Sequence, residues 1–231
     1  MNYPAASSRL AAMIELAAYI DHTLLRADAT AADIERLCAE ALEHRFHAVC
    51  VNGSRVELAR HCLEDSAVKV VAVAGFPLGA MEADAKRFEV EAAVDAGAQE
   101  LDVVINLGRL KDGNAKGVLR ELCDVVEAAQ GMPVKVIIET CLLTDEEKRL
   151  ACGLVVESGA SFVKTSTGFG PAGATVADVR LLRAAVGPKL GVKAAGGIRD
   201  RATALALIEA GANRLGTSAG VAMLRDQGLA T

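Results

Sequence analysis

The sequence is poor in aromatic residues, which make up 3% of its 231 positions, and it contains no tryptophan. Hydrophobic residues nevertheless account for 52% of the chain. A core must therefore be built from Ala, Val, Leu and Ile, the composition expected of strands buried on both faces beneath helices. The length is close to that of an eight-stranded parallel α/β barrel, about 250 residues, and we expect one domain over residues 1–231.

Runs of like charge are also absent, and the net charge is −5. Without a basic or acidic run, the sequence gives no indication of a nucleic-acid or membrane surface, and a small-molecule partner is favoured. Residues 1–19 include Arg9 and Glu15 and hold no long apolar run, so they predict neither a signal peptide nor a membrane span. We expect a short N-terminal helix there.

The six cysteines show no C-x-x-C spacing, and a chain of this length does not need disulfides to fold. They are predicted to be free thiols in the reducing cytoplasm. The four histidines, at positions 22, 44, 47 and 61, lack metal-ligand spacing. We therefore predict no metal and no other cofactor.

Short apolar, β-branched runs alternate with amphipathic segments along the whole chain, the pattern of successive strand–helix units around a parallel sheet. The predicted strands are 19–22, 47–51, 69–74, 100–105, 134–138, 161–164, 190–194 and 213–215. Eight units predict a (β/α)8 TIM barrel with a short N-terminal helix, and no linker or composition shift divides the chain. A doubly wound open sheet is the structural alternative.

Apolar residues at helical spacing form stripes that we expect to pack on the sheet. The stripes are Ile34, Leu37, Cys38, Ala41 and Leu42; Met81, Ala85, Phe88 and Ala92; and Val118, Leu122, Val125, Val126 and Ala129.

Two local patterns mark helix ends. Thr144 followed by Glu147 is a capping box, which predicts a helix start directly after the fifth strand. Gly97, Gly159 and Gly211 each precede a predicted strand. Each is expected to end a helix in the left-handed conformation and to let the chain turn back into the sheet.

Charged residues fall within or at the ends of strands that are otherwise apolar: Asp102, Glu139, Lys164 and Lys193. In a parallel barrel the C-terminal ends of the strands form the pocket. An unpaired buried charge is costly, so these groups need partners or a chemical purpose.

Two lysines beside an aspartate suit carbonyl chemistry. An amine attacks a carbonyl only when it is neutral, and a neighbouring cation lowers its pKa. The aspartate can hold the other lysine protonated and help to move protons. Position alone does not say whether Lys164 or Lys193 is the nucleophile, and a buried ion-pair network that only stabilises the barrel is the structural alternative.

Glycine-rich segments follow the seventh and eighth predicted strands, at Gly196-Gly197 and Gly216-Thr-Ser-Ala-Gly220. The loops at these places hold phosphate in many barrels, because bare backbone amides at a helix start bind the dianion. Tight turns alone would also explain the glycines. Turn chemistry suffices for the segment Gly75-Phe-Pro-Leu-Gly79, to which we assign no catalytic role.

These residues resemble deoxyribose-phosphate aldolase over nearly the whole chain. The segments that carry the resemblance, in the order of that family, are Tyr19-Ile-Asp-His-Thr-Leu-Leu25, Val49-Cys-Val51, Gly75-Phe-Pro-Leu-Gly79, Glu100-Leu-Asp-Val-Val-Ile-Asn-Leu-Gly108, Lys135-Val-Ile-Ile-Glu-Thr140, Phe162-Val-Lys-Thr-Ser-Thr-Gly-Phe169 and Gly191-Val-Lys-Ala-Ala-Gly-Gly-Ile-Arg199.

The resemblance implies a metal-free, cytoplasmic class I aldolase of deoxyribose phosphate and deoxyribonucleotide catabolism, acting as a homodimer. Its reaction would be the reversible cleavage of 2-deoxy-D-ribose 5-phosphate into D-glyceraldehyde 3-phosphate and acetaldehyde. Lys164 matches the Schiff-base lysine of the family and Lys193 the second lysine, which works with Asp102 in a proton relay that Asp21 supports.

The resemblance also implies residues that bind the substrate. Thr23 and Thr167 match residues that line the sugar site, and the phosphate loops contain Gly168, Gly196, Gly197, Gly216 and Ser218. Cys50 ends the second predicted strand near the pocket. We include it among the substrate-site residues, although core packing explains a lone cysteine as well.

Two features depart from the family pattern. Some members carry a longer tail ending in a tyrosine that helps proton transfer, whereas this sequence ends at Thr231 without one, a difference that concerns the efficiency of the relay and not its identity. Position 169 is Phe, so no lysine from that loop reaches the phosphate.

Two other functions stay open. One is another Schiff-base aldolase, of the transaldolase or keto-sugar-phosphate kind, which would act on a ketose donor. The other is a non-catalytic barrel that binds a phosphate sugar and whose lysines only neutralise the ligand.

Overall fold

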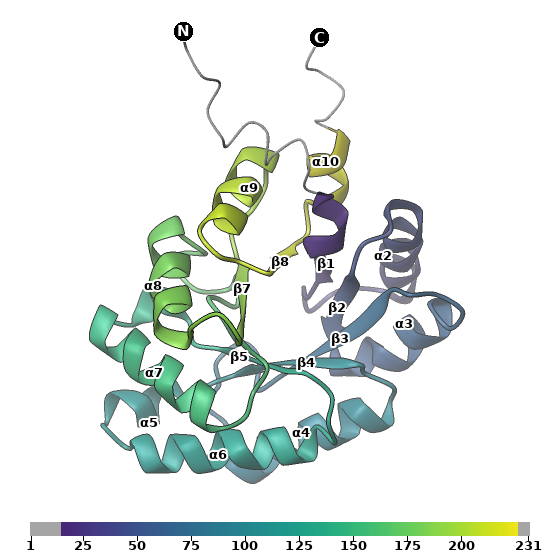
Figure 1. The fold of residues 1–231 in the computed structure, drawn as a ribbon. Helices are drawn as coiled ribbons and strands as arrows, with labels where there is room; N and C mark the ends of the chain where they lie inside the picture. Colours follow the sequence, from purple (N-terminus) through teal and green to yellow (C-terminus); the bar gives the residue numbers. More distant parts are fainter. Residues whose placement is uncertain (1–14, 226–231) are drawn as a thin grey trace, which may run out of the picture.

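The computed structural model describes residues 15–225, which form eight parallel strands closed into a barrel with helices outside it (Figure 1). The strands are β1 (Ile20–Leu24), β2 (Ala48–Asn52), β3 (Lys69–Ala74), β4 (Glu100–Val104), β5 (Val134–Ile137), β6 (Phe162–Lys164), β7 (Gly191–Ala195) and β8 (Arg214–Thr217). Neighbours in the barrel follow chain order, and β1 closes it by pairing with β8. The TIM barrel prediction is confirmed, and the open sheet is excluded.

Helices connect the strands and cover the outer face of the barrel. They are η1 (Leu16–Tyr19), α2 (Ala31–His44), η2 (Gly53–Arg55), α3 (Val56–Cys62), α4 (Ala83–Asp95), α5 (Leu107–Lys111), α6 (Ala115–Ala128), η3 (Thr140–Leu142), α7 (Asp145–Glu157), α8 (Val176–Val186), α9 (Arg201–Glu209) and α10 (Gly220–Arg225). No helix within the described residues is long and apolar enough to cross a membrane.

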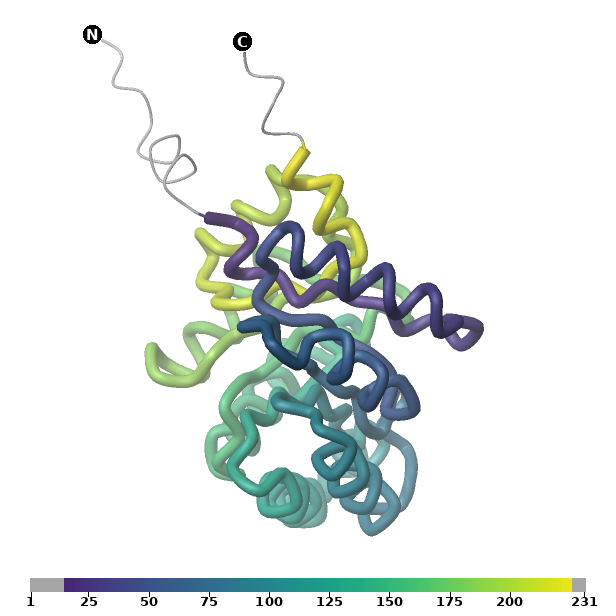
Figure 2. The backbone as a smooth tube through the Cα atoms, turned by 90° about the vertical axis from the view of Figure 1, so that its right-hand side faces the viewer, coloured from purple at the N-terminus to yellow at the C-terminus, as the bar shows by residue number. Residues whose placement is uncertain are grey.

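The first and last residues of every predicted strand lie within two residues of those of the observed strand. The differences are largest at the ends of β1 and β8, which each run two residues further than predicted, so Asp21 lies inside β1 rather than at its end. The predicted N-terminal helix falls largely on positions 1–14, outside the described residues. The segment Leu16–Tyr19 is a single 3-10 turn, and it lies beside α10 (Figure 2).

The local signals at helix ends are confirmed. The Thr144 hydroxyl accepts from the Glu147 N–H, and the Glu147 carboxylate accepts from the Thr144 N–H, so α7 starts with the predicted capping box. Gly97, Gly159 and Gly211 all have positive φ, at 100°, 81° and 116°. These values allow the reversal from helix to strand that the sequence predicted.

The prediction for α4 was wrong. Met81 and Phe88 are exposed, the latter by 67%, and the helix instead buries Lys86, Val90 and Ala93. The Lys86 amine donates to the carbonyls of Gly79 and Val104 and to the Glu121 carboxylate. Because these acceptors satisfy its charge, the lysine occupies the inner face and the apolar stripe turns outward.

Leu42 and Val126 of the other two stripes also lie at the edges of their helices rather than on the buried face. Leu42 is 42% exposed and Val126 is half-buried, while the remaining residues of both stripes are buried.

The apolar core has two parts. The larger part lies between the barrel and its helices and uses the outward residues of the strands. A smaller cluster, with Phe76 packed against it, fills the β1–β3 side inside the barrel and consists of Leu25, Ala48, Cys50, Val71 and Val73. The buried ionisable groups of the strands come from β1, β4, β5, β6, β7 and β8, so apolar and charged parts share the barrel interior.

Candidate active site

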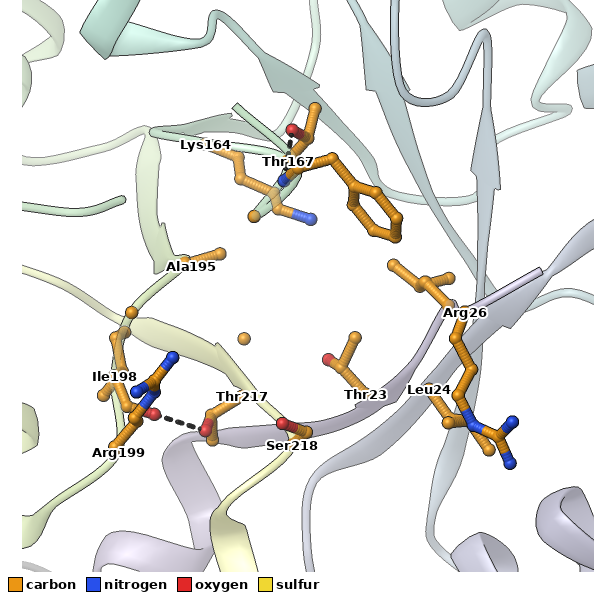
Figure 3. A pocket seen from close by; sticks show the side chains of 16 residues that line it. Thr23, Leu24, Arg26, Lys164, Thr167, Ala195, Ile198, Arg199, Thr217 and Ser218 are labelled. Carbon is orange, nitrogen blue, oxygen red and sulfur yellow. Dashed lines mark hydrogen bonds between the residues drawn. The ribbon is translucent and has the colours of Figure 1, made fainter. Parts of the chain in front are cut away.

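A pocket of about 340 Å³ opens at the C-terminal ends of β1, β6, β7 and β8. In Figure 3, Lys164 and Thr167 lie on one side of the opening, and Arg199, Thr217 and Ser218 lie on the opposite side. Lys164 is 2% exposed, yet it lines this pocket. The pocket therefore gives a small ligand access to one buried amine.

Asp102 joins the two lysines that the sequence singled out. Its Oδ2 accepts from Lys164 Nζ at 2.7 Å and from Lys193 Nζ at 2.7 Å. Lys164 and Lys193 are register partners on adjacent strands, and Asp102 reaches them from β4. The predicted convergence of two lysines and an aspartate at the barrel mouth is present.

A second layer of charges lies beneath these groups. Lys135 Nζ contacts Asp102 Oδ1 at 2.9 Å and Glu100 Oε2 at 2.7 Å. Arg214 Nη1 contacts Asp21 Oδ1 at 2.8 Å and Glu100 Oε2 at 3.2 Å. Asp21 Oδ2 then returns to Lys193 Nζ at 2.5 Å. All of these side chains are at most 9% exposed.

These contacts close a ring in which positive and negative groups alternate. In order, the ring runs Asp102, Lys193, Asp21, Arg214, Glu100 and Lys135, and back to Asp102. Three carboxylates and three cations balance each other in charge. Among residues 15–225, Lys164 contacts the ring only through Asp102, so protonating it adds an uncompensated buried charge, which is unfavourable.

The pKa shifts of the two lysines agree with this charge arrangement. Burial is the largest influence on Lys164 and lowers its pKa; repulsion from Lys193 adds to the lowering, and Asp102 only partly opposes it. Burial also acts to lower the Lys193 pKa, but attraction by Asp102 and Asp21 outweighs it and raises the pKa. Lys164 is thus suited to act as a nucleophile and Lys193 to act as a proton donor.

The Asp102 carboxylate stays ionised. Burial, the largest influence, would raise its pKa, but attraction by Lys135, Lys164 and Lys193 holds the pKa well below the usual value. A carboxylate that stays ionised between two amines favours the charged form of Lys193 and orients Lys164.

Most of the predicted substrate residues line the pocket. They are Thr23, Thr167, Gly168, Gly196, Gly197, Gly216 and Ser218. Gly216 is needed for close packing, because a Cβ there would lie 3.2 Å from Lys193 Cε and 3.0 Å from Ala195 Cβ. Gly196 and Gly197 have φ of 85° and 75°, which turns the backbone after β7 toward the pocket.

Cys50 does not line the pocket. It is fully buried in the apolar cluster inside the barrel. Burial, together with repulsion from Asp102, raises the pKa of its thiol to about 11. This placement corrects the expectation that Cys50 contacts the substrate, and it matches the alternative of a small core residue.

Glu139 is also separate from the ring. It is 3% exposed, and its carboxylate accepts from the N–H and hydroxyl of Thr167. No ion pair with Glu139 is found within residues 15–225. Of the four charged strand-end residues that the sequence singled out, three meet at the mouth and Glu139 contacts the neighbouring loop.

Sequence reasoning missed several residues of the site. Glu100, Lys135 and Arg214 complete the ring, and Arg26 and Arg199 line the pocket. Glu100 precedes Asp102 by two positions in one strand, so the period-2 rule already places both on one face. No comparable local signal marks Arg214, whose partners are 193 and 114 residues away in sequence.

The absence of a metal remains a prediction. Within the described part of the chain, no group of three or more His, Cys, Asp or Glu side chains is placed to hold one ion. The expectation about the C-terminal end concerns residues after 225, which lie outside the described residues.

The closed parallel barrel, with its buried lysine at the C-terminal mouth, places the protein among the barrel enzymes, whose active sites lie at this end. The chain belongs to the DeoC/LacD family of aldolases, because the model of that family matches residues 15–229. It is therefore a carbon–carbon lyase by family.

Known proteins are similar to this chain over almost its full length. A deoxyribose-phosphate aldolase of Alkaliphilus oremlandii is 55% identical over 215 residues, which cover 93% of this chain and 97% of that protein. One from Thermococcus gammatolerans is 58% identical over 212 residues, 90% of this chain and 94% of that protein. The solved deoxyribose phosphate aldolase from Aeropyrum pernix, described as a tetramer, is 34% identical with a TM-score of 0.89, covering 99% and 100% of the two chains.

Proposed function

We propose that this protein is a class I aldolase that reversibly cleaves 2-deoxy-D-ribose 5-phosphate into D-glyceraldehyde 3-phosphate and acetaldehyde. The observation that carries the proposal is the Lys164 amine, which lines the pocket, has a lowered pKa and lies 2.7 Å from Asp102. The names of the relatives support the choice of substrate.

In the cleavage direction, the neutral Lys164 amine attacks C1 of the open-chain sugar, and loss of water gives an iminium ion. The C3 hydroxyl gives its proton to a water in the pocket, the C2–C3 bond breaks, and its electron pair moves toward the iminium nitrogen. Glyceraldehyde 3-phosphate leaves and an enamine remains on Lys164.

The enamine then takes a proton at carbon and becomes an iminium ion again. Lys193, which its raised pKa keeps protonated, supplies this proton and recovers from the water the one taken from the C3 hydroxyl, and Asp102 holds both lysines in place. Asp21 keeps Lys193 charged from its other side. Water finally hydrolyses the iminium, which frees acetaldehyde and the Lys164 amine.

The substrate is held by the loops around the mouth. Thr23 and Thr167 face the sugar, and the phosphate rests on the backbone at Gly168, Gly196, Gly197, Gly216 and Ser218. Arg199 belongs to the same loop as Gly196 and Gly197 and lines the pocket. It supplies the positive charge that position 169, a phenylalanine, does not.

The proposal extends to the setting of the reaction. The free cysteines support a reducing cytoplasmic location. We propose one functional unit over residues 1–231 and a homo-oligomer, with a homodimer as the assembly to test first, although the Aeropyrum pernix protein is described as tetrameric.

Borohydride reduction in the presence of acetaldehyde tests the chemistry, with peptide mass spectrometry to find an N-ethylated lysine. An ethyl group on Lys164 is expected, and Lys164→Leu should lose at least about 10³-fold in turnover while keeping its fold. A label on Lys193 alone would reverse the roles of the two lysines. No label on either lysine in folded protein would favour the non-catalytic binding barrel.

The choice of donor separates the proposal from the other aldolase types. Condensation of acetaldehyde with glyceraldehyde 3-phosphate is expected to proceed, and a ketose donor is expected to fail. The opposite result would indicate an aldolase of the transaldolase or keto-sugar-phosphate kind.

A further inference from the structure

Glu139 is a buried acid that the proposed reaction does not use. It follows β5 with φ of 49° and ψ of 67°, the left-handed region that a residue with a side chain rarely adopts. Such a conformation persists only where its surroundings stabilise it, and it is found most often at functional sites. In this conformation the Glu139 side chain contacts a neighbouring loop.

Those contacts are made with the loop that follows β6. The Thr167 N–H donates to the Glu139 carboxylate at 3.3 Å, and the Thr167 hydroxyl donates to Glu139 Oε2. The same hydroxyl accepts from the Phe169 N–H at 3.1 Å. Glu139 thereby holds Thr167 directly and Phe169 through Thr167.

The Glu139 carboxylate also packs closely against Gly170 of this loop. A Cβ on Gly170 would lie 3.2 Å from the Glu139 carboxyl carbon. The far end of the loop is fixed separately, because the Ala174 N–H donates to the carbonyls of Ala195 and Gly196 at 3.1 Å. Glu139 therefore fixes the near end, directly after Lys164.

This near end forms part of the pocket wall. Thr167, Gly168 and Phe169 all line the pocket, whereas Glu139 does not. Gly168 has φ of 86°, and its Cα lies against that of Gly196 in the other phosphate loop. Any movement of Thr167 would therefore displace the backbone that faces the phosphate.

We propose that Glu139 is a positioning residue for phosphate: acting through Thr167, it sets the Gly168–Phe169 backbone that binds the phosphate group of the substrate. The inference rests on the proposed function for its substrate. It assigns to Glu139 an effect on recognition of the phosphate, and none on the chemistry at Lys164.

Three substitutions separate the hydrogen bonds from the backbone conformation. Glu139→Gln keeps the size and an acceptor oxygen, Glu139→Ala removes the acceptor and keeps the unfavourable φ, and Glu139→Gly removes the acceptor and relieves the φ. Each is assayed with 2-deoxyribose 5-phosphate and with unphosphorylated 2-deoxyribose. Activity on the latter reports that the fold and Lys164 are intact.

Glu139→Ala and Glu139→Gly should raise KM for the phosphorylated sugar by roughly tenfold to a hundredfold, as expected when hydrogen bonds to a charged group are lost. The kcat/KM for 2-deoxyribose should fall much less than that for the phosphorylated sugar, and Glu139→Gln, which keeps uncharged hydrogen bonds to Thr167, should lie between the wild type and Glu139→Ala. Equal losses on both sugars, an unchanged KM, or a Gln variant as defective as Ala would overturn the inference.

A binding measurement keeps the inference separate from the proposed activity. Inorganic phosphate should raise the Tm of the wild type and of Glu139→Gln, and it should raise that of Glu139→Ala much less. This result would support the positioning role even if the wild type cleaved neither sugar, which would refute the proposed function alone. An equal rise in all three proteins would refute the positioning role.

Discussion

At the scale of single residues, the proposed chemistry depends on an imbalance between two lysines that share one carboxylate. Lys193 is held by Asp21 and Asp102, and its pKa is raised. Lys164 has only Asp102, and burial with repulsion from Lys193 lowers its pKa. Asp21 thus favours the proton on Lys193 over that on Lys164. Asp21 and Lys193 lie 172 residues apart in the sequence.

Replacing Lys193 with Met should move the acidic limb of the kcat/KM profile to higher pH. The substitution removes a cation that lowers the Lys164 pKa, so a larger share of Lys164 stays protonated at neutral pH. The rate at the optimum should also fall by about 10²–10⁴-fold, because the proton donor is lost. A pH–rate profile with 2-deoxyribose 5-phosphate measures both effects.

Lys189→Met is the control for this experiment, because it removes an exposed lysine just before β7. Its profile should match the wild type. An acidic limb that stays in place in Lys193→Met would show that Lys193 does not tune the nucleophile.

At the scale of elements, the sequence predicted which segments are strands and helices, but it did not always predict which face of a helix is buried. The strand boundaries follow from local apolar runs. The buried face of α4 does not follow from its apolar residues. Lys86 can be buried there because hydrogen-bond acceptors from the β3–α4 loop, β4 and α6 surround its amine. Hydrophobic periodicity assigns a lysine to the surface and cannot anticipate such partners.

Lys86→Met should lower the free energy of unfolding by about 3 kcal/mol, because it leaves the buried Glu121 without its closest cation. The double variant Lys86→Met with Glu121→Leu should regain much of that loss, since it removes both buried charges. Urea unfolding at pH 7 gives the free energies.

Lys111→Met breaks an ion pair with the partly exposed Glu147 and should leave stability unchanged within error. If Lys86→Met were as harmless as this control, the buried pair would contribute nothing to holding α4 in place.

At the scale of the whole molecule, the six-membered charge ring joins strands from both ends of the chain across the barrel interior. Its carboxylates Asp21, Glu100 and Asp102 each have a lowered pKa: burial, the largest influence, would raise it, but the surrounding cations outweigh burial. The same ring that contributes to lowering the Lys164 pKa therefore also contributes to stability.

The ring should make the protein sensitive to acid. A carboxylate whose pKa is lower in the folded than in the unfolded state stabilises the fold fully above its unfolded pKa of about 4. That stability is lost as the pH falls further, toward the folded pKa. The Tm, followed by circular dichroism, should stay level from pH 7 to about pH 5 and fall steadily below about pH 4. A main loss between pH 5 and pH 7 would point to histidines instead.

The sequence by itself determined the barrel and the chemical parts. Apolar strands that alternate with amphipathic helices predict a parallel barrel, and the motifs around Asp102, Lys164 and Lys193 placed reactive groups within or at the ends of its strands. The tertiary structure alone decided how these groups are paired: that Asp21 serves Lys193, that Glu139 faces Thr167, and that Cys50 is enclosed. The reason is that pairing depends on barrel closure and strand register, which bring together residues far apart in the chain, whereas a sequence pattern reports only neighbours.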